Sequence, residues 1–183
     1  MACDTLTRGR QEPCKNSVGG IKNIYFTDFG DFGTVTLTDD EITDMSGTFT
    51  AFKYEVKGNS SLEQTVNSSR ENGTTFYEQT LNLTLKKLSK EDNKELKLLA
   101  YGRPHVAVED YNGNVMVVGL EHGADVSGGT VVTGAAMGDL SGYTLTLTAM
   151  ETKPANFVAS PTAADPYAGM ASATVTVTPG SDW

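Results

Sequence analysis

The chain of 183 residues has little of what enzymes and secreted proteins commonly depend on: two cysteines, two histidines and one tryptophan. Its hydrophobic residues come in short runs, none near the roughly 20 residues that cross a membrane as a helix. The N-terminus, MACDTLTRGRQEPCK, lacks the apolar core of a secretory signal. These absences predict a protein that is made in a cytoplasm and has no membrane partner.

The two cysteines, Cys3 and Cys14, lie in a polar segment near the N-terminus. Two thiolates cannot complete a zinc site alone, and a reducing compartment disfavours a disulfide. We therefore expect free thiols, with a disulfide formed after cell lysis as the alternative.

Positive charge is scarce. The formal net charge is −9, and residues 104–183 carry eight acidic side chains against one basic side chain, Lys153. Binding of nucleic acid by neutralising its phosphates is therefore not expected. The basic residues gather elsewhere, as the solvated face of a helix and its flanks or, alternatively, as a partner contact: Lys86, Lys87, Lys90, Lys94, Lys97 and Arg103.

Catalytic motifs are missing as well. Two DFG triplets span residues 28–33, but the chain has neither an HRD loop nor a glycine-rich phosphate loop with its lysine, which excludes a kinase. Phe29 and Phe32 are then core or interface aromatics. His105 and His122 stand in no motif that would pair either of them with a nucleophile. We expect no enzyme, no catalytic residue and no cofactor.

One acidic run has enough carboxylates for calcium but lacks the ligand spacing of a calcium loop. Its members are Asp28, Asp31, Asp39, Asp40, Glu41 and Asp44. The glycines of GADVSGG lack the Gly-Lys-Ser/Thr ending of a phosphate loop, so they serve backbone geometry. We expect no metal site.

The fold class follows from frequent Thr and Gly and from short alternating apolar runs, which favour many strands and few helices. Leu81, Leu83 and Leu85, for example, alternate with polar residues as in a half-buried strand. A turn or short helical stretch is expected around residues 39–44. The expected strands cover 21–26, 34–38, 48–56, 62–67, 75–85, 105–111, 114–119, 143–151 and 171–177.

Local signals predict one helix, one hairpin and one loop. Ser89 followed by Asp92 resembles a capping box, and Gly102 supplies a C′ glycine with Pro104 two residues later as a stop, so a helix is expected over 90–101. Asn112-Gly113 is typical of a type I′ hairpin turn. Six glycines between residues 123 and 142 predict a loop.

The chain divides into an arm and one domain. Residues 1–20 are polar and end in two glycines, so we expect an N-terminal arm, followed by a single β-rich domain over 21–183. The arm, residues 57–73 and residues 123–142 are the candidates for contacts between subunits.

The order of these segments resembles tail-tube and neck-ring proteins of bacteriophages, particularly phages of Bacteroidetes hosts. The resemblance rests on the hairpin DYNGNVMVVG, the loop GADVSGG and the segment TGAAMGDLSGYTLTLTAMETKPANFV, preceded by one capped helix. It implies an antiparallel β-sandwich or barrel of tail-tube type with a flanking helix. It also implies a virion protein that forms a hexameric or higher ring with neighbouring tail or neck proteins, through which genomic DNA passes without specific binding.

Two other functions stay open from the sequence. One is a head decoration or head–tail connector protein of the same particle. The other is a carbohydrate-binding β-sandwich module, for which Tyr54, Tyr77 and Tyr167 are the available stacking aromatics. The acidic excess predicts a negatively charged channel wall if a ring forms, and otherwise serves solubility.

Overall fold

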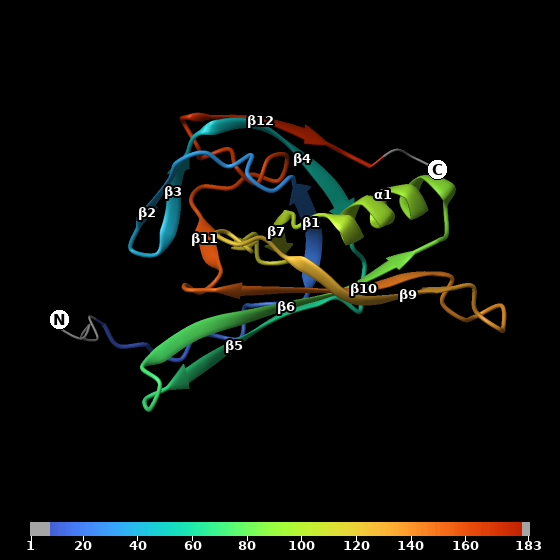
Figure 1. Cartoon of the computed structure of the whole chain (residues 1–183), viewed down its shortest axis with the longest axis horizontal. Coiled ribbons are helices and arrows are strands. Elements are labelled where there is room, and N and C mark those ends of the chain that lie inside the picture. The colour runs from blue at the N-terminus through green and yellow to red at the C-terminus, as the bar shows by residue number, and fades with distance from the viewer. Residues whose placement is uncertain (1–7, 181–183) are drawn as a thin grey trace.

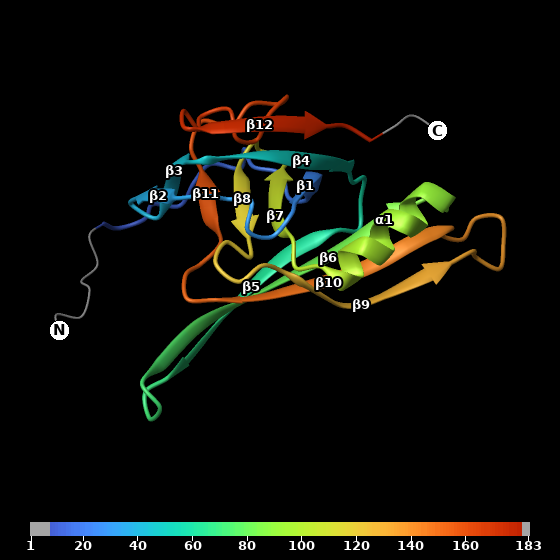
Figure 2. The same cartoon turned by 45° about the horizontal axis from the view of Figure 1, so that its top comes forward.

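The computed structural model describes residues 8–180, in which regular structure consists of two β-sheets and one α-helix. The two sheets pack one over the other, and the helix lies against one end of the pair (Figures 1 and 2). The expected mainly β class with one flanking helix is confirmed, although neither sheet closes into a barrel. None of the helical residues within 8–180 forms a span long and apolar enough to cross a membrane.

The larger sheet, sheet A, has eight strands. In chain order they are β1 (Ile21–Thr27), β2 (Val35–Thr38), β3 (Glu41–Met45), β4 (Gly47–Glu55), β7 (His105–Asp110), β8 (Val115–Val118), β11 (Asn156–Val158) and β12 (Ala173–Thr178). In space their order is β12-β4-β1-β7-β8-β11-β3-β2. Most neighbours are antiparallel, but β12 runs parallel to β4, and β11 runs parallel to β3. These two parallel pairs are the exceptions in an otherwise antiparallel sheet.

The smaller sheet, sheet B, is a four-stranded antiparallel meander in the order β5-β6-β10-β9. Its strands are β5 (Ser61–Ser69), β6 (Thr74–Lys86), β9 (Asp125–Val132) and β10 (Gly142–Glu151). The β5–β6 hairpin and the β9–β10 hairpin extend in opposite directions beyond sheet A (Figures 1 and 2). Sheet B is thus longer than the part of the core that it covers.

Two apolar clusters hold the layers together. The first lies between the sheets and joins Ile24 and Val106 of sheet A to Leu81 and Leu147 of sheet B. The second lies on the opposite face of sheet A, where Tyr167 covers it from the segment before β12. Strands β1 and β7 are buried on both faces, so both of their side-chain rows are enclosed.

Helix α1 (Lys90–Tyr101) has the expected bounds and the expected N-cap. The Ser89 hydroxyl accepts the backbone N–H of Asp92 at 3.0 Å, which satisfies one of the free donors of the first turn. Leu96 is buried and Leu99 packs against the core between the sheets. Gly102 is the C-cap and is extended (φ −97°, ψ 178°), unlike the left-handed glycine that commonly ends a helix, and its N–H donates to the carbonyls of Leu98 and Leu99.

The β7–β8 hairpin has a different turn from the one expected. Gly113 has a positive φ of 84°, but Asn112 is not among the residues with positive φ, so the turn is not type I′. The N–H of Gly113 donates to the carbonyl of Asp110, and the N–H of Asp110 donates to the carbonyl of Asn114. This pattern is a three-residue loop that ends in a left-handed glycine.

Three strands were not expected. Residues 39–44 contain a tight turn at 39–40 and then β3, with no helical stretch. Strand β11 is three residues long, too short for a periodicity to develop. The 123–142 stretch, expected to be a loop, contains β9, in which Gly129 lies so close to β10 that an added Cβ would come 2.6 Å from the Thr144 carbonyl oxygen.

Candidate assembly surface

Sheet B ends on each side in a strand with no neighbouring strand among residues 8–180. β5 is nine residues long and pairs only with β6, and β9 is eight residues long and pairs only with β10. Such strands present a row of backbone N–H and C=O groups that another strand can complete. One contact covers part of β5: the Gln64 Oε1 atom accepts the N–H of Ala155 at 2.7 Å.

Apolar side chains are exposed along these edges and hairpins. Val66 on β5 is 57% exposed and Val131 on β9 is 63% exposed. Phe76 of β6 and Met150 of β10 are also exposed, and Met137 at the tip of the β9–β10 hairpin is fully exposed. A single exposed apolar residue needs no explanation. Here, however, both unpaired edge strands carry one.

The face of sheet B that points away from the core is mainly polar, although the exposed Phe76 and Met150 also lie on it. Because side chains alternate across a strand, the leucines at 81, 83, 145 and 147 face inward and their neighbours face outward. Hydroxyls and amides join across the strands on this outer face. Thr130 and Thr144 are 2.6 Å apart, Ser127 and Thr148 are 2.9 Å apart, and Thr146 donates to the Asn82 side-chain oxygen at 3.0 Å.

Charge on the outer face is sparse and mainly negative. The register places Glu63, Glu78 and Asp125 on it, with Lys86 at one end as the basic residue. The lysines at 90, 94 and 97 are exposed on α1, which packs toward the opposite, core-facing side. The Arg103 guanidinium lies 4.8 Å over the Phe29 ring. The basic residues therefore do not line the polar face of sheet B as a group.

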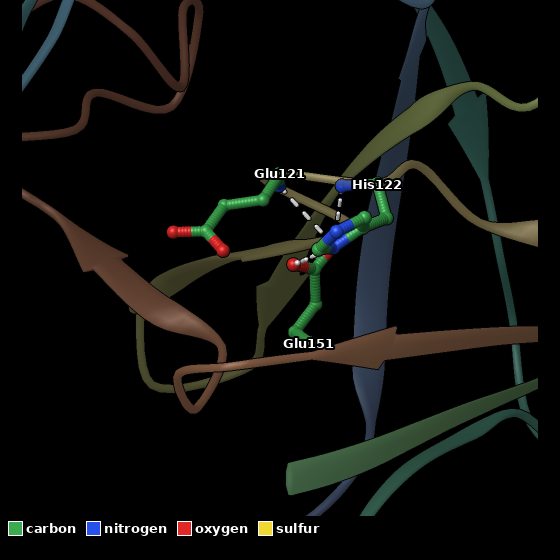
Figure 3. A group of neighbouring side chains, drawn as sticks. All are labelled: Glu121, His122 and Glu151. Carbon is green, nitrogen blue, oxygen red and sulfur yellow. Dashed lines mark hydrogen bonds and ion pairs between the residues drawn. The ribbon is translucent and has the colours of Figure 1, made fainter.

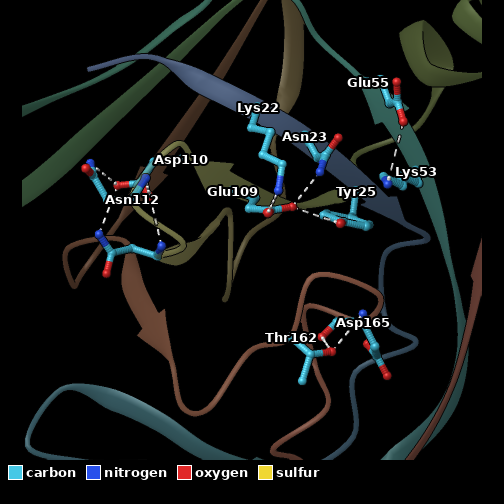
Figure 4. Close-up of polar contacts among 11 residues, drawn as sticks. Lys22, Asn23, Tyr25, Lys53, Glu55, Glu109, Asp110, Asn112, Thr162 and Asp165 are labelled. Carbon is cyan, nitrogen blue, oxygen red and sulfur yellow. Dashed lines mark hydrogen bonds and ion pairs between the residues drawn. The ribbon is translucent and has the colours of Figure 1, made fainter. Parts of the chain in front are cut away.

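The N-terminal arm leaves the domain at the β7–β8 turn. The Asn112 side chain holds Val18 as a neighbouring strand would, since its Oδ1 accepts the Val18 N–H at 2.9 Å and its Nδ2 donates to the Val18 carbonyl at 2.7 Å. The Asp110 carboxylate in turn accepts hydrogen bonds from the backbone N–H and the side-chain amide of both Asn112 and Asn114 (Figure 4). Burial alone raises the pKa of Asp110, but these hydrogen bonds outweigh it and lower the pKa below its ordinary value.

A buried carboxylate, Glu109, lies on the face of sheet A that points away from sheet B, beside Tyr25 of the second apolar cluster. Glu109 accepts hydrogen bonds from Lys22 Nζ at 2.9 Å, Asn23 Nδ2 at 2.6 Å and the Tyr25 hydroxyl at 3.0 Å (Figure 4). Burial raises the pKa of Glu109, but the bonds from Asn23, Lys22 and Tyr25 together hold it below the usual range. This group ties β1 to β7 and is satisfied within the protein.

A second buried carboxylate, Glu151, holds the turn that follows β8. It accepts the backbone N–H groups of Glu121 at 3.2 Å and His122 at 2.9 Å, and it lies 3.1 Å from His122 Nδ1 (Figure 3). One ligand atom from each of these three residues lies within 4.8 Å of the others, so they are the described residues that could hold a metal ion. Glu121 also accepts from Thr152 and pairs with Lys153. The observed contacts give the group a structural role in anchoring the turn.

His105 is buried, and its two nitrogens are both used. Nδ1 lies 2.6 Å from the carbonyl of Gly119 and must donate to it, while Nε2 accepts the N–H of Gly30 at 3.3 Å. Burial lowers the pKa of His105, which favours this neutral tautomer. Phe29 and Phe32 stack on the ring at 5.1 and 4.3 Å. The two phenylalanines of the DFG triplets are thus packed around a histidine, and Phe29 stays partly exposed.

The carboxylates of the acidic run, residues 28–44, do not gather at one site in the fold. Asp44 accepts both the N–H and the hydroxyl of Ser172, which lowers its pKa. The run contributes no member to a metal-ligand group within residues 8–180. Three of its members, Asp39, Asp40 and Glu41, instead line a groove between the sheets, described below.

The three tyrosines proposed for carbohydrate stacking do not share a surface. Tyr167 is buried in the second core cluster, and Tyr54 packs edge-on against Phe26 at 5.1 Å. Desolvation raises the pKa of Tyr54 to about 12. Tyr77 lies on the core-facing side of β6, so these residues form no stacking platform. Cys14 is an exposed free thiol, and Cys3 lies outside the described residues.

Comparisons of the chain with protein-family models, curated proteins and solved structures found no match. The functional argument therefore rests on geometry. The unpaired edges of sheet B and the Asn112 anchor of the arm were not expected from the sequence. The one sequence signal at the anchor was the Asn112-Gly113 dipeptide, which predicts a turn and does not indicate that the Asn112 side chain binds Val18.

Proposed function

We propose that this chain is a virion structural protein that self-associates into a ring or tube and forms part of a phage tail or neck channel. The observation that supports the proposal most is sheet B, a meander with two unpaired edges and a polar outer face. A monomer gains nothing from leaving two strands of eight and nine residues unpaired, because exposed edges favour aggregation. An assembly in which the edges meet removes that liability.

A ring follows from the two edges being different. If β5 of one copy adds to β9 of the next, the interface is head-to-tail, and it closes when the rotation between copies divides a full turn. Strand addition supplies main-chain hydrogen bonds, and the exposed Val66 and Val131 supply apolar contacts. The four-stranded sheets of all copies would then form one continuous wall.

The polar face is the side of sheet B suited to a channel. Several of its hydroxyls are bonded to one another or to the Asn82 amide, and its charged residues are three carboxylates and one lysine. A wall of this kind repels phosphates weakly and offers no row of cations to hold them, so DNA would slide past it. The alternative roles of head decoration or head–tail connector share self-association but not this channel.

Variants at the two edges test the proposal. We expect the wild-type protein to sediment as rings or larger assemblies, and Val66→Lys or Val131→Lys to sediment as a monomer, because a lysine on an edge strand blocks pairing. Leu98→Lys is the matched control, since Leu98 is 56% exposed but lies on α1. Circular dichroism checks that each variant keeps its fold.

Three results would contradict the proposal. The first is a strictly monomeric wild-type protein at high concentration. The second is an assembly that both edge variants leave intact, since subunits would then associate through another surface. The third is salt-sensitive binding of double-stranded DNA by the assembled protein.

A further inference from the structure

A groove of about 630 Å³ opens where the two sheets meet. Its apolar lining includes Leu62 of β5, Met116 of β8 and Phe157 of β11, and Phe157 is 48% exposed. Its other wall is the β2–β3 turn with Asp39, Asp40 and Glu41. No lysine or arginine lines the groove. The groove therefore combines apolar contact area with three uncompensated negative charges.

The chemistry of the groove selects an extended, basic peptide. Three carboxylates side by side repel one another and favour a partner that carries guanidinium or ammonium groups. The apolar floor suits the aliphatic stems of such side chains, which pack on apolar surface while the charged head reaches a carboxylate. DNA and other polyanions are disfavoured by the same charges.

A segment of this chain has the required chemistry. The described arm, residues 8–20, is exposed throughout and carries Arg8, Arg10 and Lys15 against the single acidic Glu12. It belongs to no strand, and its backbone is held to the domain by Asn112 at Val18. From that anchor, residues 8–17 reach about 35 Å when extended, roughly the diameter of a compact domain of this length. The arm is long enough to reach the next subunit.

We propose that this groove binds the N-terminal arm of a second copy of the chain, with Arg8 and Arg10 against Asp39, Asp40 and Glu41. The inference rests on the proposed self-association. In the single chain, the arm residues are exposed and the groove is open, so neither is filled by the other. Ordering a polar arm costs conformational entropy, and a charged groove on a neighbour supplies the compensating contacts. Each copy would give its arm to one neighbour and receive an arm from another.

Thiol cross-linking tests the contact, because Cys14 is an exposed free thiol on the arm. In a Cys3→Ser background, Glu41→Cys adds a second thiol at the groove, and Glu95→Cys adds one on exposed α1 as the control. The assembled protein, sized by sedimentation beforehand, is treated with a bis-maleimide. We expect covalent dimers and longer ladders from Glu41→Cys and few from Glu95→Cys. Reversing Arg8 and Arg10 to glutamate should lower the cross-linking yield about tenfold, which corresponds to about 1.4 kcal/mol of binding.

The outcomes separate the two proposals. Assemblies that form but give no ladder with Glu41→Cys overturn the arm contact and leave the proposed function standing. A cross-link confined to single chains also overturns it, since the arm would then fill its own groove. Protein that is monomeric before treatment overturns both, because the occupant is a second copy. A ladder unaffected by the arginine reversal contradicts the assigned charge pairing.

Discussion

Replacing Glu109 by glutamine is expected to lower the free energy of unfolding by about 2–4 kcal/mol. The carboxylate accepts from two buried donors, the Asn23 amide and the Tyr25 hydroxyl, and from the half-exposed Lys22. Glutamine has one acceptor oxygen, and its amide turns a donor toward a donor. At least one buried group then loses its partner, and each such loss costs about 1–3 kcal/mol, more where the bond was to a charge.

The assay is urea unfolding at a concentration where the protein is monomeric. Glu63→Gln is the matched control, because Glu63 is exposed on β5 and its change should stay within about 0.5 kcal/mol. The urea midpoint of Glu109→Gln should fall while the slope stays constant, since the surface exposed on unfolding is unchanged.

Glu109 should also make the free energy of unfolding depend on pH. The pKa of Glu109 is lower in the folded protein than in the unfolded chain, where it is about 4.3. Its contribution to stability is therefore complete above that value and is lost as the pH falls through the folded pKa. Wild-type protein should lose stability faster than Glu109→Gln over that acid range. Equal stability of the two proteins at pH 7, or parallel acid profiles, would refute the role assigned to this group.

Three further changes test local features. Ser89→Ala should cost about 1 kcal/mol by thermal unfolding, since the Asp92 N–H loses its acceptor; no change would mean that the helix starts elsewhere. Gly113→Val should destabilise by about 1–2 kcal/mol more than Gly113→Asn, because φ is 84° and asparagine tolerates the left-handed region; indistinguishable melting would argue against this turn. Burial lowers the pKa of His105, so as the pH falls below about 6.5 the unfolded chain binds a proton before the folded protein does, and the wild-type protein loses stability. His105→Gln should lose less stability over this pH range; an unchanged pH dependence would show that His105 does not contribute to it.

Local chemistry determined what could be predicted from the sequence. The alternating leucines and threonines of β6 and β10 identified both strands and their buried faces, and Ser89 with Asp92 identified the start of α1. The sequence-based prediction was wrong where pairing with a neighbouring strand determines the conformation, as in β9. Gly128 and Gly129 have the composition of a loop, yet both lie in β9 and pair with β10. At Gly129 the two strands are so close that a residue with a side chain would meet the Thr144 carbonyl oxygen.

The candidate surface was harder to predict because it depends on pairs of residues far apart in the chain. Asn112 lies 94 positions from Val18, and Gln64 lies 91 positions from Ala155. No sequence period indicates that β5 and β9 end opposite sides of one sheet, since strand order is set by packing on the shared core. The tyrosines and the acidic run were recognisable by type, but their exposure and their separation in space were not.

Electron microscopy of the purified, assembled protein tests the central claim most directly. The account predicts closed rings or stacked tubes, in which a continuous wall of sheet B strands faces a central channel with its threonine face inward and β5 of each copy beside β9 of the next. A monomer under every condition, or an assembly whose channel is lined by sheet A or by the lysines of α1, would contradict it.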